Sequence, residues 1–192
     1  MTTTTKKTTS RKKAPKAVEK LPVNPFTFEV LELASKQRSK AKKIEILKEY
    51  EHASLKSIFI WNFDDTVISL IPEGDVPYGD ANDQSVYSGS LSENISKEVS
   101  GGESATGQDL DGRGKTSLRR EYQNLYHYVK GGNNSLSSIR REMMFINLLR
   151  GLHPKEAELL CLVKDKKLET KYKISFDVVE SAYPDIQWGG RS

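Results

Sequence analysis

The chain has 192 residues and a formal net charge of +4, with 36% hydrophobic and 29% charged residues. Its apolar runs span only a few residues and its Thr/Lys-rich start lacks an apolar stretch, so we expect no transmembrane helix and no signal peptide. The single cysteine, Cys161, permits no disulfide within one chain, and its apolar neighbours predict a small buried hydrophobe in a protein of a reducing compartment.

Charge is distributed unevenly along the chain. Residues 1–20 carry a net charge of +6, from seven basic residues and one acidic residue. Residues 73–111 carry −8, from nine acidic residues and one basic residue, and residues 112–192 carry +6, from fifteen basic and nine acidic residues. The basic tail at 1–22 and the Ser/Gly-rich acidic insertion at 80–114 contain too few large apolar side chains to offset chain entropy, so we predict that both are disordered.

Residues 23–79 are predicted to form the N-terminal helical part of a single domain. Asn24 and Pro25 are typical of a helix start, and Ser39 begins a second, amphipathic helix with a solvated Lys/Glu face. The third segment, ASLKSIFIWNF, combines large apolar side chains and favours a buried helix over a short strand. Turn and loop residues follow in IPEGDVPYG.

Residues 115–192 are predicted to form the C-terminal helical part of the same domain, around three helices. In the first helix, a period of 3.6 residues predicts an apolar face made of Leu118, Tyr122, Leu125, Tyr126 and Val129. The second helix has Ser135 as its predicted N-cap and so wide an apolar face that it should be central. Its predicted core seam comprises Leu136, Ile139, Met143 and Ile146, widened by Phe145, Leu148 and Leu149.

Pro154 is predicted to begin the third of these helices, and Ser175 to begin a short final one. Tight connections at Gly131-Gly132 and Gly151 separate the segments. The sequence therefore predicts an all-α fold, a compact bundle of short helices with a disordered basic N-terminal tail and a long acidic disordered insertion.

Two short stretches are similar to catalytic or metal-binding motifs. The stretch GRGKTS ends like a phosphate-binding loop, but that pattern needs glycine at the position of Asp109, so Thr116 or Ser117 is better interpreted as a helix N-cap. The adjacent Asp64 and Asp65 would point to different faces of a helix, and Asp65 is predicted to cap the segment TVISLI.

The three histidines, His52, His127 and His153, stand far apart in the sequence without a Cys/His grouping at metal-ligand spacing. A serine-hydrolase nucleophile elbow does not occur either. We therefore predict no enzyme activity, no catalytic residues, no metal, no cofactor and no small-molecule substrate.

Basic and aromatic side chains are interleaved over the first two helices of the C-terminal part, a mixture that can hold phosphates and stack on bases. The candidate nucleic-acid-binding residues are Lys115, Arg119, Arg120, Tyr122, Tyr126, Lys130, Arg140 and Arg141. The basic tail could add further phosphate contacts. The alternative is a solvated charged face, in which the arginines pair with Glu121, Glu142 and the acidic insertion.

The C-terminus, DIQWGGRS, places an aromatic residue before a diglycine. Trp188 and Arg191 are candidate residues for docking on a partner protein. The alternative is that Trp188 packs locally on the body of the protein, as a hook.

Several stretches of the chain together resemble a known family. They are FIWNFDDTVISLIPEG with VPY, TSLRREYQNLYHYVKGGNNSLSSIRREMMFINLL, GLHP with EAE, LVKDKKL, and AYPDIQWGGR. Over residues 24–79 and 115–192 the chain resembles small proteins of unknown function encoded by T-even-like tailed bacteriophages, especially those that infect cyanobacteria. The resemblance implies a phage setting and the host cytoplasm, and it transfers no site residue. The long acidic insertion is a departure from the shorter connection expected in such proteins.

Three hypotheses about function follow. The favoured one is a non-enzymatic accessory protein of phage infection, which binds nucleic acid or a protein of replication or transcription. The second is a minor virion or assembly protein that docks on other phage proteins, and the third is an inhibitor or modifier of a host protein. The expected partners are thus nucleic acid or phage and host proteins, with no membrane partner, in the host cytoplasm or in the virion.

Overall fold

The N-terminal part of the fold consists of three short helices. The structure, a computed structural model, describes residues 20–74 and 115–190, so the predicted insertion and nearly all of the predicted tail lie outside it. The three helices are α1 (Thr27–Ser35), α2 (Lys40–Glu49) and α3 (Ala53–Phe63). The prediction of a helix rather than a strand for the third segment is confirmed.

The C-terminal part continues with further short helices. They are α5 (Leu118–Glu121), the 3-10 helix η2 (Tyr122–Tyr128), α6 (Ser138–Gly151), α7 (Pro154–Lys164), α8 (Leu168–Tyr172) and α9 (Phe176–Ala182). The described ranges contain only helices apart from one isolated β-bridge, which confirms the prediction of an all-α fold. None of the described helices is long and apolar enough to cross a membrane.

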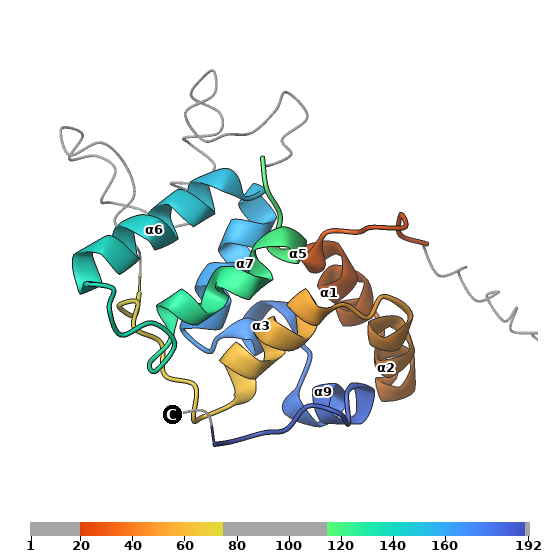
Figure 1. The fold of residues 1–192 in the computed structure, drawn as a ribbon. Helices are drawn as coiled ribbons and strands as arrows, with labels where there is room; N and C mark the ends of the chain where they lie inside the picture. Colours follow the sequence, from red (N-terminus) through yellow and green to blue (C-terminus); the bar gives the residue numbers. More distant parts are fainter. Residues whose placement is uncertain (1–19, 75–114, 191–192) are drawn as a thin grey trace, which may run out of the picture.

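Helix α3 lies at the centre of the molecule, with α5 and η2 along one side and α7 behind it (Figure 1). It buries large side chains from more than one face, and these are Leu55, Ile58, Phe59 and Trp61. The rings of Phe59 and Phe63 pack against Tyr183 and Phe176, which attach the α9 segment to the face of α3 away from η2. The central position predicted for α6 is therefore wrong, because α3 occupies it.

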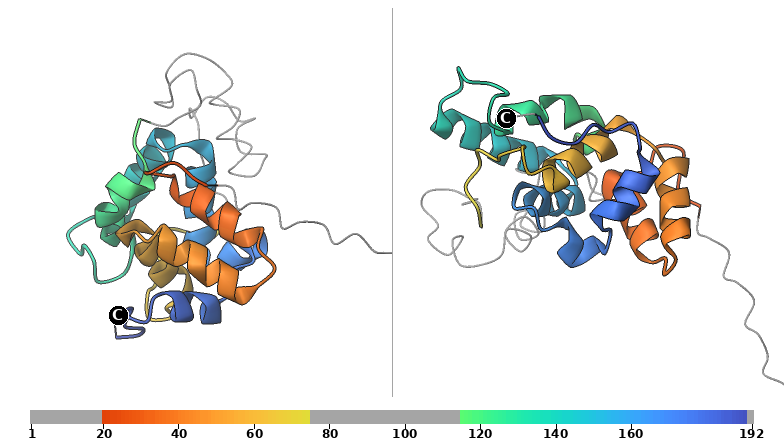
Figure 2. Two further views of the ribbon diagram at one scale, coloured as in Figure 1. Left: turned by 90° about the vertical axis from the view of Figure 1, so that its right-hand side faces the viewer. Right: turned by 90° about the horizontal axis from the view of Figure 1, so that it is seen from below.

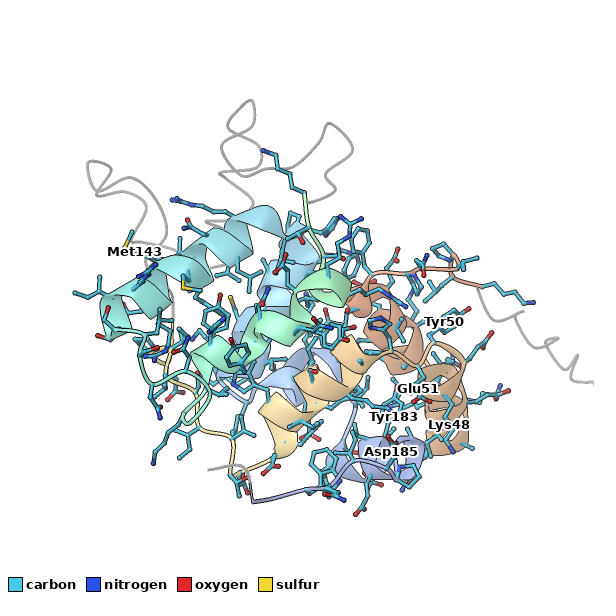
Figure 3. All side chains as sticks on the ribbon, viewed as in Figure 1. Lys48, Tyr50, Glu51, Met143, Tyr183 and Asp185 are labelled. Carbon is cyan, nitrogen blue, oxygen red and sulfur yellow. The ribbon has the colours of Figure 1, made fainter. Side chains whose placement is uncertain are left out.

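Helix α6 packs with only part of the face predicted. Its N-cap is Ser137, not Ser135, and its buried residues Arg141, Phe145 and Leu149 follow one another at intervals of four. Two residues of the predicted seam point outward, with Ile139 73% exposed and Met143 59% exposed, whereas Ile146 of the same seam is partly buried against the core. Met143 extends away from the body in Figure 3. Positions two residues apart lie about 200° apart around a helix, so a core centred on Phe145 places Met143 on the outer side.

This outer seam provides a test of the packing. Met143→Lys is expected to change the free energy of unfolding by less than about 0.5 kcal/mol, because the substitution alters an exposed side chain without removing a core contact. Thermal unfolding followed by circular dichroism measures the effect, and Ile139→Lys should behave in the same way. A fall of several degrees in the melting temperature would show that the seam is core, as its sequence pattern suggests.

The segment after α5 forms a 3-10 helix where the sequence predicts a continuous α-helix. With three residues per turn, Tyr122, Leu125 and Tyr128 share one face, and the last two of these are buried. Tyr126, predicted to be core, is 48% exposed as a result. Gly131 has a φ of +81°, and a Cβ on Gly132 would lie 1.9 Å from the carbonyl oxygen of Tyr126, so this turn requires both glycines.

The segment TVISLI forms a turn and a β-bridge, not a helix capped by Asp65. Asp64 is the buried carboxylate, and its Oδ1 accepts hydrogen bonds from the amide and hydroxyl of Thr66, at 2.9 and 2.6 Å. Ser69 then pairs with Val129 in an isolated antiparallel bridge. The prediction that Asp65 caps this segment was wrong, because the carboxylate that accepts the hydrogen bonds of the turn is that of Asp64.

The C-terminal segment docks on the body of the protein. Trp188 packs edge-on against Phe176 with 4.9 Å between the ring centroids, and the amide of Gly189 donates to Asp64 Oδ2 at 2.9 Å. Trp188 therefore packs locally on the body, which is the alternative to the predicted role in docking on a partner, and Arg191, the other predicted docking residue, lies outside the described residues. Cys161, predicted to be a small buried hydrophobe, is half-buried against the core.

Candidate nucleic-acid interface

A pocket of about 340 Å³ opens between α3 and η2. It brings together three of the predicted nucleic-acid-binding residues, Tyr122, Tyr126 and Lys130. Ser57, Ile60 and Trp61 of α3 form the opposite wall, and their spacing places them along one face of that helix. The backbone of Gly131 and Gly132 completes the lining.

Two hydrogen bonds on either side of the β-bridge fix the mouth of the pocket. The amide of Leu70 donates to the carbonyl of Tyr128 at 2.8 Å, and the amide of Lys130 donates to the carbonyl of Ile68 at 2.9 Å. These bonds tie the end of η2 to the segment that follows α3. Lys130 is thus held at the pocket by its backbone while its side chain stays exposed.

Stacked aromatic rings support the pocket from beneath. Trp61 lies nearly parallel to Tyr128, with ring centroids 6.4 Å apart, and Tyr128 meets Phe145 of α6 edge-on at 5.1 Å. Burial, together with the Glu121 carboxylate, raises the pKa of Tyr128 to about 12, so its hydroxyl stays neutral at physiological pH. Packed rings of this kind give the pocket a rigid apolar base.

The two tyrosines at the pocket differ in exposure. Tyr122 is half-buried and meets His52 edge-on at 5.7 Å between centroids, which restrains its ring. Tyr126 is exposed at the rim, with its ring centroid 4.0 Å from that of His127. An exposed ring beside an apolar pocket can stack on a planar group that enters from solvent.

The remaining candidate cations lie on surfaces beyond the pocket lining. Lys115, Arg120 and Arg140 are exposed. Arg119 is half-buried, and its Nη1 donates to the carbonyl of Pro25 at 3.2 Å. Its charge adds to burial in lowering the pKa of His52, so Arg119 lies close to the Tyr122 end of the pocket.

The alternative ion pairs predicted for these arginines do not form within the described ranges. Glu121 accepts from the Thr116 hydroxyl at 2.7 Å and from the Asn124 side-chain amide at 3.0 Å. Among the described residues, no salt bridge joins Arg119, Arg120 or Arg140 to Glu121 or Glu142.

Arg141 is the predicted nucleic-acid contact that the structure contradicts. It is only 7% exposed, and its guanidinium donates to the carbonyls of His127, Asn133 and Leu136 at 2.8, 3.0 and 3.0 Å. Arginine suits this position because its planar fork presents several donors at once. Arg141 therefore holds the loop between η2 and α6 and is not available to a phosphate.

The histidines have local structural partners. Nδ1 of His52 accepts from the amide of Ser54 at 3.1 Å, and Nδ1 of His153 accepts from the amide of Lys155 at 3.2 Å, so both residues are N-caps. Within the described ranges, no three His, Cys, Asp or Glu side chains are grouped to hold a metal ion. Sequence reasoning did not identify the caps because histidine is uncommon at that position.

A family model matches residues 30–103 and 104–170 of the chain. The chain belongs to DUF6433, a family of unknown function. No curated protein and no solved structure matches this chain. The pocket of this DUF6433 protein lies wholly within the matched ranges, whereas Trp188 lies beyond them.

Sequence reasoning missed the α3 side of the pocket. The segment that contains Trp61 was predicted only as a buried helix, since an apolar pattern does not reveal that Trp61 packs in the core on one side and lines a pocket on the other. The ASLKSIFIWNF stretch gives one signal, because Ser57 is a small polar residue among large apolar neighbours on the face toward η2.

Proposed function

We propose that this DUF6433 protein is a non-enzymatic accessory protein of phage infection that binds single-stranded nucleic acid in the host cytoplasm. The observation that carries the proposal is the convergence of Tyr122, Tyr126 and Lys130 on one pocket. Small-molecule pockets span about 300–1,000 Å³, so a pocket near the lower limit suits a group the size of one base.

The pocket supplies both kinds of contact that single-strand binding needs. A base that enters it can stack on the exposed ring of Tyr126, and Lys130 can neutralise a neighbouring phosphate. Stacking discriminates little between bases, because every base has a π-face, so we expect weak sequence preference. Duplex DNA keeps its bases stacked inside and should bind less tightly.

The binding test uses tryptophan fluorescence, since the chain has two tryptophans and one of them lines the pocket. In a Trp188→Phe variant, Trp61 alone reports, and labelled single-stranded DNA or RNA is expected to quench it. Tyr126→Ala should weaken binding about tenfold, in line with about 1–3 kcal/mol for one stacked base, whereas Tyr126→Phe should bind like the parent protein. Unchanged affinity in Tyr126→Ala would overturn the pocket as the binding site.

A second function is supported by a different observation. The outer face of α6 exposes Ile139 and Met143, four residues apart on one side of the helix, which suits docking on a protein. This favours the alternative of a minor virion or assembly protein, or of an inhibitor of a host protein. Copurification from infected cells distinguishes the assembly role from the accessory role. Recovery in purified virions supports the assembly role, and recovery with replication or transcription proteins supports the accessory role.

A further inference from the structure

A second basic surface lies at the start of α2. Five cations stand in the eight residues from Lys36 to Lys43, with no acidic residue among them. Lys36, Arg38, Lys40 and Lys42 are exposed, and Lys43 is half-buried. The sequence pattern had suggested only a solvated amphipathic helix here.

Packing brings another cation to the same place. Lys43 Nζ donates to the backbone carbonyl of Lys173 at 2.5 Å, which sets the end of α8 beside the first turn of α2. Lys40 pairs with Asp177 of α9 at 2.7 Å, and α2 and α9 lie side by side in Figures 1 and 2. We call Lys36, Arg38, Lys40, Lys42, Lys43 and Lys173 the α2 basic surface.

The charge of this surface is poorly compensated. Elsewhere lysines pair with carboxylates, as Lys155 does with Glu32 and Lys167 with Glu73. On the α2 basic surface, Asp177 neutralises Lys40, but within the described ranges no salt bridge joins Arg38 or Lys42 to an acid. Uncompensated like charges repel one another, so their clustering needs a reason outside the fold.

Helix stability does not supply that reason. The first turn of α2 holds lysines and no acidic residue, although the positive end of a helix dipole favours acidic side chains there. Residues that oppose the helix dipole without improving the packing of the core are typical of a functional site. An anionic partner would relieve the repulsion.

The α2 basic surface is separate from the aromatic pocket. Helix α9 packs on the face of α3 that bears Phe59 and Phe63, and the pocket lies on the face that bears Ser57 and Trp61.

We infer that the α2 basic surface is a second contact for the nucleic-acid backbone, which binds phosphates without reading bases. The inference rests on the proposed function for the class of partner, but it makes no use of the pocket. Arg38, Lys42 and Lys173, which no salt bridge of the described residues joins to an acid, can each neutralise one phosphate. The partner would thus touch two faces of the protein.

The test measures how affinity for a labelled single-stranded oligonucleotide varies with salt, using the full chain with Trp188→Phe. The surface variant carries Arg38→Gln, Lys42→Gln and Lys173→Gln, which leave the contacts of Lys40 and Lys43 intact. The matched control carries Lys48→Gln, Lys155→Gln and Lys167→Gln, three exposed lysines outside the surface. Each lost phosphate contact should lower the slope of log affinity against log salt by about 0.7.

We expect the surface variant to lose about 2 from the slope and the control less than about 0.5. Equal slopes in the two triple variants would overturn the inference, while continued quenching of Trp61 would leave the pocket in place. A reduced slope in the surface variant without any quenching of Trp61 would support the inference and reject the pocket. Absence of binding at low salt would reject both.

Discussion

Removal of the Glu156 side chain is expected to lower the free energy of unfolding by about 4 kcal/mol at pH 5. Glu156 is fully buried in the first turn of α7. Its Oε1 accepts from the amide of Thr27 at 3.0 Å, and its Oε2 accepts from the amide of Leu118 at 2.9 Å. In Glu156→Ala both amides would be buried without an acceptor, at about 1–3 kcal/mol each.

These two amides give Glu156 its structural importance. Thr27 is the first residue of α1 and Leu118 is the first residue of α5, and neither helix has an N-cap side chain that accepts a hydrogen bond. One carboxyl group from α7 therefore caps the N-termini of two other helices. The N-terminal and C-terminal parts of the domain are joined at this point.

The stability contributed by Glu156 is expected to depend on pH. Burial raises the pKa of Glu156 from 4.5 to about 7, against the lowering effect of its hydrogen bonds. Between these values the folded protein keeps a proton that the unfolded chain has released, so stability falls as pH rises. The cost of Glu156→Ala should therefore shrink by about 2–3 kcal/mol between pH 5 and pH 8.

Urea unfolding at both pH values measures this effect, with Glu158→Ala as the matched control. Glu158 stands on the same helix but makes only a partly exposed salt bridge with Lys171, worth less than about 1 kcal/mol. Burial lowers the pKa values of His52 and His153, which gives stability the opposite pH dependence, so the comparison must be between variants. A cost of Glu156→Ala that is the same at both pH values would contradict the raised pKa.

The sequence predicts the helices better than it predicts how they face one another. Apolar content identifies α3, and Pro154 in the first turn identifies α7, because both signals are local. The outward position of Ile139 and Met143 could not be predicted, since both have the pattern of a core, and tertiary contacts bury the face of α6 that carries Arg141 and Phe145 instead. A buried carboxyl such as Glu156 has no sequence signal either, because its partners are backbone amides far away in the chain.

The candidate site was predictable only in part. Tyr126 became exposed because η2 has three residues per turn, and Tyr128 took its place in the core. Tyr126 was predicted to bind nucleic acid because of its residue type. It therefore remains a candidate even though the segment is a 3-10 helix and not the expected α-helix. Arg141 was misassigned for the same reason, since charge alone does not reveal which donors backbone carbonyls already occupy.

Arg141→Lys is expected to lower the free energy of unfolding by about 3 kcal/mol, even though it keeps the positive charge. One ammonium cannot reach the three carbonyls of His127, Asn133 and Leu136 that the guanidinium joins, and hydrogen bonds from charged groups contribute about 1.5–3 kcal/mol each. Thermal unfolding measures the loss. Arg140→Lys, at the exposed neighbouring position, is the matched control and should change stability by less than about 0.5 kcal/mol.

The same substitution separates a structural role of Arg141 from a phosphate contact. A phosphate contact would tolerate lysine, so affinity for single-stranded nucleic acid, its salt dependence and the melting temperature would all stay near the parent values. A structural role instead predicts a lower melting temperature and weaker binding at the pocket. The reason is that the loop held by Arg141 also carries Lys130, Gly131 and Gly132 into the pocket. Arg141→Lys should then reduce the quenching of Trp61 while the contribution of the α2 basic surface to the salt slope persists, since that surface lies on the other side of α3.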